Sequence, residues 1–475
     1  MKSVQRTAPG YRPSWVLAIA VGSAIGWGAF VLPFDWLVTG GVYGSILGFV
    51  VGAILVTIVG LSYGSAIERY PVTGGAVAYA LAAFGRKHAV IAGWSLALGY
   101  ASIVALNASA VTLVFRMIAP HATMRIPLYS VAGWDIYLVE VLLASVFLIV
   151  FALLSSQHAA LSGRFQLGAV MIMTGAVLFL LLASVMFGGR GNDAAPAFPS
   201  DVDPLVAILS IVAIVPWAYV GFDSIPQLAG EFSFSPRKAT SLLIWGVFGA
   251  TAIYISMIVV TAMLAGNDLQ AFSDSAWPTA EAIGSNLGPL GTVVLLIAVV
   301  AGVVTGINGF YIASSRVLLT MGKMKILPGS FARLDANSGV PKNAVLAVMA
   351  VCLISPWFGR AALTWIVDMA SAGITVSYIY TCAAVLKVGL GKRLLGQPTA
   401  VGKSPYLIVI GSIGSIIGLG FLSLLFIPGA PGNLQKPALI ALLVWFGIAA
   451  SFYFLRRSRV FAVPEDLLVS EVLSR

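Results

Sequence analysis

Charge is scarce in this chain. Only 9% of the 475 residues are Asp, Glu, Lys or Arg, whereas 59% are hydrophobic, and soluble domains carry about 25% charged residues. The composition therefore excludes an ordinary soluble protein and predicts an integral membrane protein. The first apolar run is too long for the hydrophobic core of a signal peptide, so we expect it to remain as a spanning helix.

Cysteine and histidine are also rare. The two cysteines, Cys352 and Cys382, lie in apolar segments, and the three histidines are scattered. This pattern excludes a disulfide framework and carries no signature of a metal site. The sequence also has no glycine-rich phosphate loop and no nucleophile–base pair. We expect no cofactor, no metal and no enzymatic activity.

The chain contains many apolar runs that are long enough to cross a bilayer. A spanning helix needs about 17–25 residues. We predict an all-α membrane protein of about twelve spans between residues 14 and 456, with short polar tails at 1–13 and 457–475. The predicted spans are 14–38, 43–67, 89–117, 136–155, 165–187, 205–229, 239–265, 289–318, 343–358, 363–388, 405–427 and 436–456.

The net charge of +10 could suit nucleic acid, but its distribution indicates topology instead. With twelve spans, all but five of the 27 lysines and arginines fall on the side that holds both termini; those five are Arg116, Arg125, Arg190, Arg360 and Lys436. Cytoplasmic loops are enriched in Lys and Arg. We therefore expect both termini in the cytoplasm and no nucleic-acid partner.

Two of the predicted spans are interrupted near their centres by helix-breaking residues. In the first span three glycines crowd positions 22–28, and Pro33 follows. Close helix packing is one explanation of such glycines, but their density favours unwinding. Unwinding would expose amides at the start of a half-helix, where an anionic group such as a carboxylate binds well. The candidate binding residues here are Ser23, Ala24, Gly26, Trp27, Gly28, Ala29 and Phe30.

The second interruption lies in the sixth span. Pro216 lacks an N–H and frees upstream carbonyls, and Gly221 lets the backbone leave the helix. Freed carbonyls suit an ammonium group, and aromatic faces can attract a cation; packing or interfacial roles for the aromatics remain open. The candidate binding residues are Trp217, Ala218, Tyr219, Val220, Gly221 and Asp223.

Asp223 is the most informative charge, because an ionisable group inside a membrane segment is costly and usually functional. It either takes part in transport, by titrating or by pairing with a substrate amine, or serves as a structural carboxylate that accepts hydrogen bonds from freed amides. Further candidates for gating or coupling are polar residues in apolar spans. They are Ser102, Asn107, Asn308, Ser314 and Ser315, although serines often bond back to their own helix.

Together these residues resemble the amino acid–polyamine–organocation (APC) permeases. The matching blocks are 26–30, with its Gly-Trp-Gly; 71–79, which begins Pro-Val-Thr-Gly-Gly; 217–223; and 315–328, with Ser-Arg and Leu-Pro at its ends. They occur in the family's order and span nearly the whole chain.

The resemblance implies two inverted five-helix repeats, about 14–187 and 205–388, with broken helices one and six, followed by two trailing helices at about 405–456. It also implies that the amides of 26–30 hold a substrate carboxylate, and that the carbonyls of Trp217 and Val220 hold its amine. The chain departs from the family at Trp27, which replaces a small residue, and at Met173, which stands where some relatives carry a sodium-substituting lysine.

We therefore expect a secondary transporter that moves a small amino acid or organic amine across a bacterial-type plasma membrane by alternating access. A proton or sodium ion is the candidate coupling partner, lipid surrounds the helices, and no oligomeric state is assigned. An amine or polyamine exchanger is the alternative within this class. A channel or a substrate-sensing receptor on the same scaffold is the alternative from a different class.

Overall fold

The computed structural model describes residues 10–131, 133–188, 195–359, 361–392, 394–395, 402–430 and 432–473. The N-terminal residues 1–9 and several counted cations, among them Arg190, Arg360 and Arg393, lie outside these ranges. Within them, nine helices are long and apolar enough to cross a membrane. These are α3 (Pro33–Arg69), α5 (Arg86–Ile118), α7 (Leu138–Ser155), α8 (Ala159–Phe187), α11 (Arg237–Ala265), α12 (Pro278–Lys323), α14 (Ala361–Gly389), α15 (Pro405–Phe426) and α16 (Lys436–Phe461).

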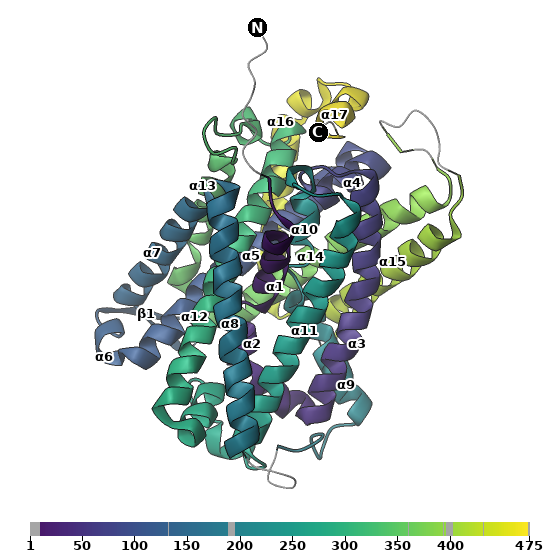
Figure 1. The fold of residues 1–475 in the computed structure, drawn as a ribbon. Helices are drawn as coiled ribbons and strands as arrows, with labels where there is room; N and C mark the ends of the chain where they lie inside the picture. The colour runs from purple at the N-terminus through teal and green to yellow at the C-terminus, as the bar shows by residue number, and fades with distance from the viewer. Residues whose placement is uncertain are drawn as a thin grey trace.

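Shorter elements complete the described fold, which is the predicted all-α, multi-span architecture (Figure 1). The short α-helices are α1 (Pro13–Ile25), α2 (Gly28–Val31), α4 (Gly75–Phe84), α6 (Pro120–Thr123), α9 (Pro204–Ala218), α10 (Ser224–Gln227), α13 (Lys342–Cys352) and α17 (Glu465–Leu473). Single 3₁₀ turns are η2 (Ala229–Glu231), η3 (Leu269–Phe272), η4 (Gly329–Ala332) and η5 (Ser355–Phe358).

The structure has fewer long helices than the twelve predicted spans because some spans are interrupted and are built from shorter elements. The first predicted span becomes α1, α2 and the start of α3, and the sixth becomes α9 and α10. Two helices run through a non-helical glycine: α3 kinks at Gly41 and α12 at Gly288, each with φ of 64°. The short ninth span is α13 followed by η5.

The structure corrects the start of the fourth span, which was predicted at residue 136. A hairpin of β1 (Pro127–Val131) and β2 (Trp134–Tyr137) precedes α7, and the two strands pair antiparallel. Gly133 between them has φ of 80°, which only glycine adopts readily. The aromatic and β-branched residues that flank this turn suit extended backbone, so the apolar run is shared between a strand and a helix.

The block at 71–79 leads into a short helix. This helix is α4, whose residues are buried except for half-buried Phe84. Gly74, which precedes α4, has φ of 86°, and its amide donates to the Gln227 carbonyl at 3.0 Å. The helix is therefore packed inside the protein beside α5 and α14.

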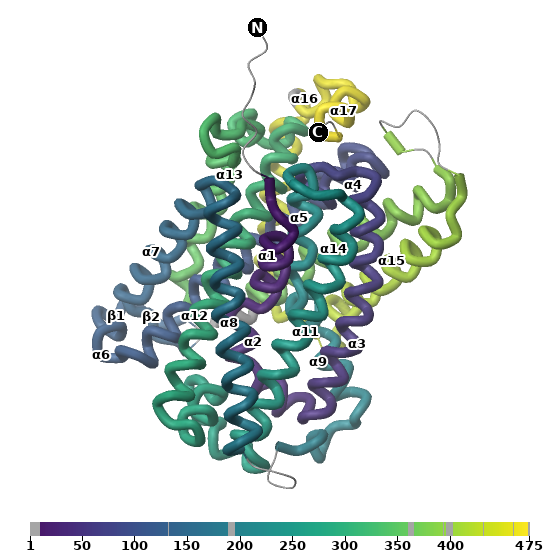
Figure 2. Tube along the Cα trace, viewed as in Figure 1, coloured from purple at the N-terminus to yellow at the C-terminus, as the bar shows by residue number. Residues whose placement is uncertain are grey.

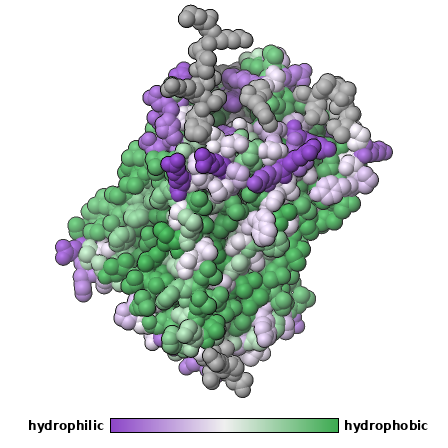
Figure 3. All heavy atoms as spheres, in the orientation of Figure 1, coloured by the Kyte–Doolittle hydropathy of each residue, from purple (hydrophilic) through white to green (hydrophobic). Residues whose placement is uncertain are grey.

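Apolar side chains cover the middle of the molecular surface, and hydrophilic side chains gather toward one end (Figure 3). Exposed apolar residues include Leu182, Met186 and Leu455, which are 65%, 69% and 83% exposed. Such a surface suits lipid contact. The start of α1, α4 and α17 lie at the same end of the molecule, and α1 runs inside the bundle among α8, α11 and α12 (Figure 2).

Candidate functional site

The first interruption separates α1 from α2 at Gly26 and Trp27. Gly26 has φ of 49° and ψ of −148°, a conformation that ends α1. Gly28 begins α2, and a Cβ added to it would clash with the indole ring of Trp217. The first amides of a helix have no acceptor within it, so the start of α2 offers donors at the point where the two interrupted segments meet.

The second interruption follows Pro216, which lies inside α9 two residues before its end at Ala218. Gly221 has φ of 136°, and a Cβ added there would clash with the backbone amide of Ala24. Gly221 therefore permits a backbone-to-backbone approach that a larger residue would block. The two breaks are in direct contact.

Tyr254 of α11 links the two interruptions. Its hydroxyl lies 2.7 Å from the Ala24 carbonyl of α1 and 2.7 Å from the Ala218 carbonyl of α9. Both carbonyls belong to helix ends that have lost their next turn, and Tyr254 is fully buried. The single O–H of Tyr254 can donate to either carbonyl, so this hydroxyl bridges the two breaks. The sequence analysis missed Tyr254, because other hydroxyl residues such as Thr251 and Ser256 lie on the same helix and nothing local sets this one apart.

Two indoles line the contact between the breaks. The ring centroids of Trp27 and Trp217 are 6.3 Å apart with an interplanar angle of 58°, and the two residues are 5% and 6% exposed. The Trp27 Nε1 group is buried and has no hydrogen-bond partner among the described residues. A buried donor without a partner normally costs free energy, so this group is available to a ligand.

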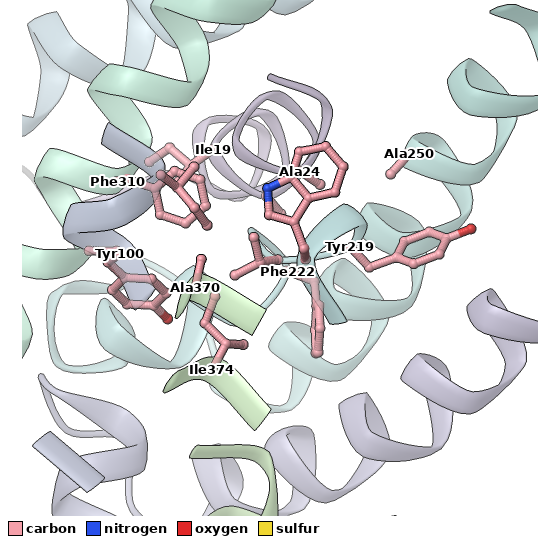
Figure 4. Close-up of a cluster of buried hydrophobic side chains, with 14 of the residues drawn as sticks. Ile19, Ala24, Tyr100, Tyr219, Phe222, Ala250, Phe310, Ala370 and Ile374 are labelled. Atoms are coloured by element: carbon pink, nitrogen blue, oxygen red, sulfur yellow. The ribbon is translucent and has the colours of Figure 1, made fainter. Parts of the chain in front are cut away.

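Tyr219 and Phe222 lie elsewhere around the second break. The Tyr219 hydroxyl is 2.9 Å from the Phe49 carbonyl and 2.9 Å from Thr251 Oγ1. Figure 4 shows its ring pointing toward the helix that carries Ala250 and away from Tyr100. The Tyr219 side chain therefore ties α9 to α3 and α11, while its backbone stays at the break.

Asp223 is completely buried and closes the second break by hydrogen bonds. Its Oδ1 accepts from the Gly221 amide at 2.9 Å, and its Oδ2 accepts from the Tyr100 hydroxyl at 2.8 Å. The same hydroxyl lies 2.9 Å from the Asp223 carbonyl. This geometry favours the structural reading of Asp223, and it adds Tyr100 of α5, which the sequence analysis had not selected.

Among the five candidate gating residues, Asn107 joins the site. A Cβ added to Gly26 would lie 3.1 Å from Asn107 Oδ1. Its Nδ2 donates to the Ile103 carbonyl at 2.9 Å, whereas Oδ1 is buried and has no donor among the described residues. Asn107 therefore presents an unused acceptor beside the first break. Ser102, on the same helix, is 8% exposed.

Asn308 belongs to a separate buried network. Its Nδ2 donates to Gln166 Oε1 at 2.7 Å, and its Oδ1 accepts from Ser162 at 2.9 Å and from Ser155 at 3.1 Å. Gln166 in turn donates to the Thr305 carbonyl at 3.0 Å. These bonds join α7, α8 and α12.

The two adjacent serines at 314 and 315 bond back to their own helix. Ser314 donates to the Phe310 carbonyl, and Ser315 donates to the Ile312 carbonyl. Both serines are fully buried. Met173, at the position of the relatives' lysine, is a buried core residue.

Arg316, counted among the cations of the cytoplasmic side at the end of the predicted span 289–318, is a buried charge. It lies inside α12, 1% exposed, and forms a two-pronged ion pair with Glu231 at 2.9 and 3.0 Å. The bidentate partner compensates the buried charge. Tyr11, in the segment before α1, donates its amide to the Glu231 carbonyl at 2.9 Å. Glu231 was missed; its signal was an acidic residue directly after the second break.

The described residues contain no group of three or more His, Cys, Asp or Glu that could hold a metal ion. In the structure the two helix interruptions are in contact. Tyr254 and Asp223 form hydrogen bonds at these interruptions, and the indoles of Trp27 and Trp217 lie between them. Paired broken helices of this kind define the substrate site of secondary membrane transporters.

Comparison with known proteins agrees with this class. The family model described as "Amino acid permease" matches residues 14–449. The chain belongs to the amino acid permease family within the APC superfamily, and it is a multi-pass membrane transporter of amino acids rather than an enzyme.

Its relatives match it along most of their length. The chain is 26% identical to the branched-chain amino acid permease BcaP of Lactococcus lactis, with 92% of each chain covered. It is 20% identical to the methylthioribose transporter of Bacillus subtilis, over 96% of this chain and 94% of that protein. It is 24% identical to the histidine permease HisP of L. lactis, with 81% of each chain covered.

Proposed function

We propose that this protein is a secondary active transporter that carries a small, neutral, apolar amino acid by alternating access. The observation that supports this most directly is the contact between the two breaks: Gly28 against Trp217, and Gly221 against Ala24. A substrate bound there touches both interrupted segments, so its presence favours conformations in which both close around it.

The substrate carboxylate binds the amides at the start of α2, at Gly28 and Ala29, which have no acceptor within the helix. The Phe30 amide already donates to the Trp27 carbonyl at 3.0 Å. The substrate amine binds carbonyls of the second break, at Trp217 and Val220. The Trp217 carbonyl already accepts from the Val220 amide at 3.2 Å, but a carbonyl has two lone pairs. The unpaired Asn107 Oδ1 and Trp27 Nε1 supply one further acceptor and one further donor.

The preference for an apolar side chain rests on what surrounds the breaks. Figure 4 shows Ile19, Tyr100, Phe310 and Ile374 grouped around this region, all of them buried. Asp223 is the ionisable residue closest in sequence to the second break, and both of its oxygens already accept hydrogen bonds within the protein. A cationic side chain would find no free counter-charge from it.

Two of the relatives agree with this preference, whereas others are named for histidine or methylthioribose. Branched-chain amino acid permeases of L. lactis and B. subtilis are 26% and 24% identical to the chain. An amine exchanger is the second candidate, and the paired indoles of Trp27 and Trp217 favour it, because indole faces attract cations.

The orientation and the repeats belong to the same proposal. The start of α1 and α17 lie at one end (Figure 1), and the excess of Lys and Arg supports a cytoplasmic location for that end, in a bacterial-type plasma membrane. Repeats of about 14–187 and 205–388 put the two breaks in corresponding positions. Coupling to a proton or to sodium, or simple exchange, completes the cycle.

Counterflow in proteoliposomes tests the proposal. Vesicles loaded with unlabelled leucine should accumulate labelled leucine transiently, and external leucine or alanine should compete while putrescine should not. Counterflow with putrescine and not with leucine would establish the amine exchanger instead. Flux without counterflow would indicate a channel and would refute the carrier mechanism.

A further inference from the structure

An open groove of about 450 Å³ lies between α5 and α16, away from the two breaks. Its walls are apolar and aromatic. The wall-forming residues include Ile91 and Trp94 of α5 and Phe446, Ala450 and Phe454 of α16. Ile91, Phe446 and Phe454 are 46%, 37% and 66% exposed, so the groove faces the surroundings of the protein rather than its core.

Two cations stand together at one end of this groove. Lys87 lies in the first turn of α5, Arg457 lies near the end of α16, and both are exposed groove residues. Neither forms an ion pair among the described residues. The acidic residue nearest in the adjoining hollow is Glu465, which accepts from the Arg86 amide at 2.5 Å. The groove therefore ends in two unneutralised positive charges.

The spacing of these residues matches one leaflet of a bilayer. Lys87, Ile91 and Trp94 repeat at helical intervals on α5, and Phe446, Ala450 and Arg457 do so on α16. From Phe446 to Arg457 a helix rises about 16 Å, and one leaflet contributes about 15 Å of hydrocarbon. The apolar part of the groove thus has the depth of an acyl chain, with its cations at the level of a headgroup.

The floor of the groove is held in a fixed shape by aromatic contacts. Trp445 donates its Nε1 to the Trp94 carbonyl at 3.1 Å, and the two rings are 5.4 Å apart in an edge-to-face arrangement. Phe452 lies 6.0 Å from the Trp94 ring. A preformed surface loses less entropy when a flexible chain binds.

We propose that this groove is a binding site for an anionic phospholipid. The phosphate pairs with Lys87 and Arg457, and one acyl chain lies along the apolar wall. Basic pockets between membrane helices recognise anionic headgroups in this way. A second copy of the chain fits less well, because two such grooves facing each other would bring four cations together. The site is independent of the transported substrate.

The test measures lipid retention by native mass spectrometry of the purified full-length protein. Delipidated protein is titrated with dioleoyl phosphatidylglycerol or with phosphatidylcholine of the same acyl chains. We expect the wild type to retain phosphatidylglycerol preferentially. The double variant Lys87→Gln/Arg457→Gln should bind it roughly tenfold more weakly or worse, because each cation near the surface contributes several-fold in affinity.

Two further variants make the test specific. Arg237→Gln/Lys238→Gln removes the same charge from exposed cations outside the groove, and it should retain the lipid like the wild type. Ala450→Trp keeps both cations but fills the groove, and it should lose phosphatidylglycerol. Inorganic phosphate at millimolar concentration should not displace the lipid.

Three outcomes would overturn the proposal. Equal loss in the Arg237/Lys238 control would show a diffuse electrostatic effect. Unchanged binding in both Lys87→Gln/Arg457→Gln and Ala450→Trp would place the lipid elsewhere. A dimer that dissociates on Ala450→Trp, without lipid loss, would assign the groove to a second copy of the chain.

Discussion

At the scale of single residues, the site depends on positions where the absence of a side chain matters. Gly28 is one of them, because Trp217 occupies the space that a Cβ would need. Gly175, on α8, has no atom within 4 Å of an added Cβ, so it offers a matched comparison.

Gly28→Val should abolish uptake, because the indole of Trp217 must move and the amides at the start of α2 are no longer approachable. Overpacking of this kind costs about 1–3 kcal/mol. Uptake and substrate-induced thermal shift are measured for both variants. Gly175→Val should transport normally; equal transport by Gly28→Val would remove the first break from the site.

Asp223→Asn tests the carboxylate that closes the second break. Both carboxylate oxygens accept hydrogen bonds, from Gly221 and from Tyr100, whereas an amide offers only one acceptor. We expect impaired uptake and a loss of about 1–3 kcal/mol of stability from the unsatisfied donor. The melting temperature and the uptake rate are measured together.

Tyr100→Phe separates the two readings of Asp223. If the carboxylate stabilises the second break through its hydrogen bonds, Tyr100→Phe and Asp223→Asn should both lower the melting temperature and the uptake rate. If Asp223 carries a proton during transport, only Asp223→Asn should flatten the pH profile of uptake. Wild-type transport and stability in Asp223→Asn would contradict both readings.

At the scale of elements, the sequence predicted most of the helices because their apolar runs have the length of a bilayer. It also predicted both interruptions, since Gly26, Pro216 and Gly221 carry their conformational effect locally. It did not predict what holds those interruptions together. Tyr254 and Tyr100 act through contacts with distant helices, and no local pattern marks a tyrosine that will meet two carbonyls.

The hairpin and Arg316 show the same limit. Residues 136 and 137 were predicted to begin a spanning helix, because apolar and aromatic residues fit either a strand or a helix. The sequence did not predict that Arg316 is buried, because its partner Glu231 is 85 residues away in the chain. Burial of a charge depends on such a partner, which periodicity does not reveal.

Tyr254→Phe tests the link between the two broken helices. Removing the hydroxyl leaves the carbonyls of Ala24 and Ala218 without this donor, which costs about 1–3 kcal/mol for a buried group. We expect a lower melting temperature and reduced uptake. Tyr406→Phe, at a position 55% exposed, should leave both unchanged. A wild-type melting temperature in Tyr254→Phe would show that the breaks are held by packing alone.

At the scale of the whole molecule, one ion pair joins segments of both broken helices to α12 on the side of α17. There Glu231, which follows the second break, pairs with Arg316 of α12, and the segment before α1 is tied to the same residue through Tyr11. Elements from both broken helices and from α12 therefore meet at one ion pair. We expect that opening toward this side requires the pair to separate, so that its strength affects the balance between the two facing states.

Glu231→Gln should shift that balance toward the state open on the α17 side. A change of about 1–2 kcal/mol alters the equilibrium between the two facing states by roughly 5- to 30-fold. The shift is measured as the rate at which a membrane-impermeant maleimide labels the variant Ser23→Cys. The background lacks the two native cysteines, both buried. Inside-out vesicles expose the α17 side to the reagent.

Glu471→Gln provides the matched control, because its partner Lys325 is 3.5 Å away and both side chains are 40% or more exposed. Exposed pairs contribute little, so this variant should label at the wild-type rate. Faster labelling in Glu231→Gln alone would show that the buried Glu231–Arg316 pair holds the protein closed on this side. Equal rates in all three proteins would mean that the helices are held shut by packing, and that the Glu231–Arg316 pair only compensates a buried charge.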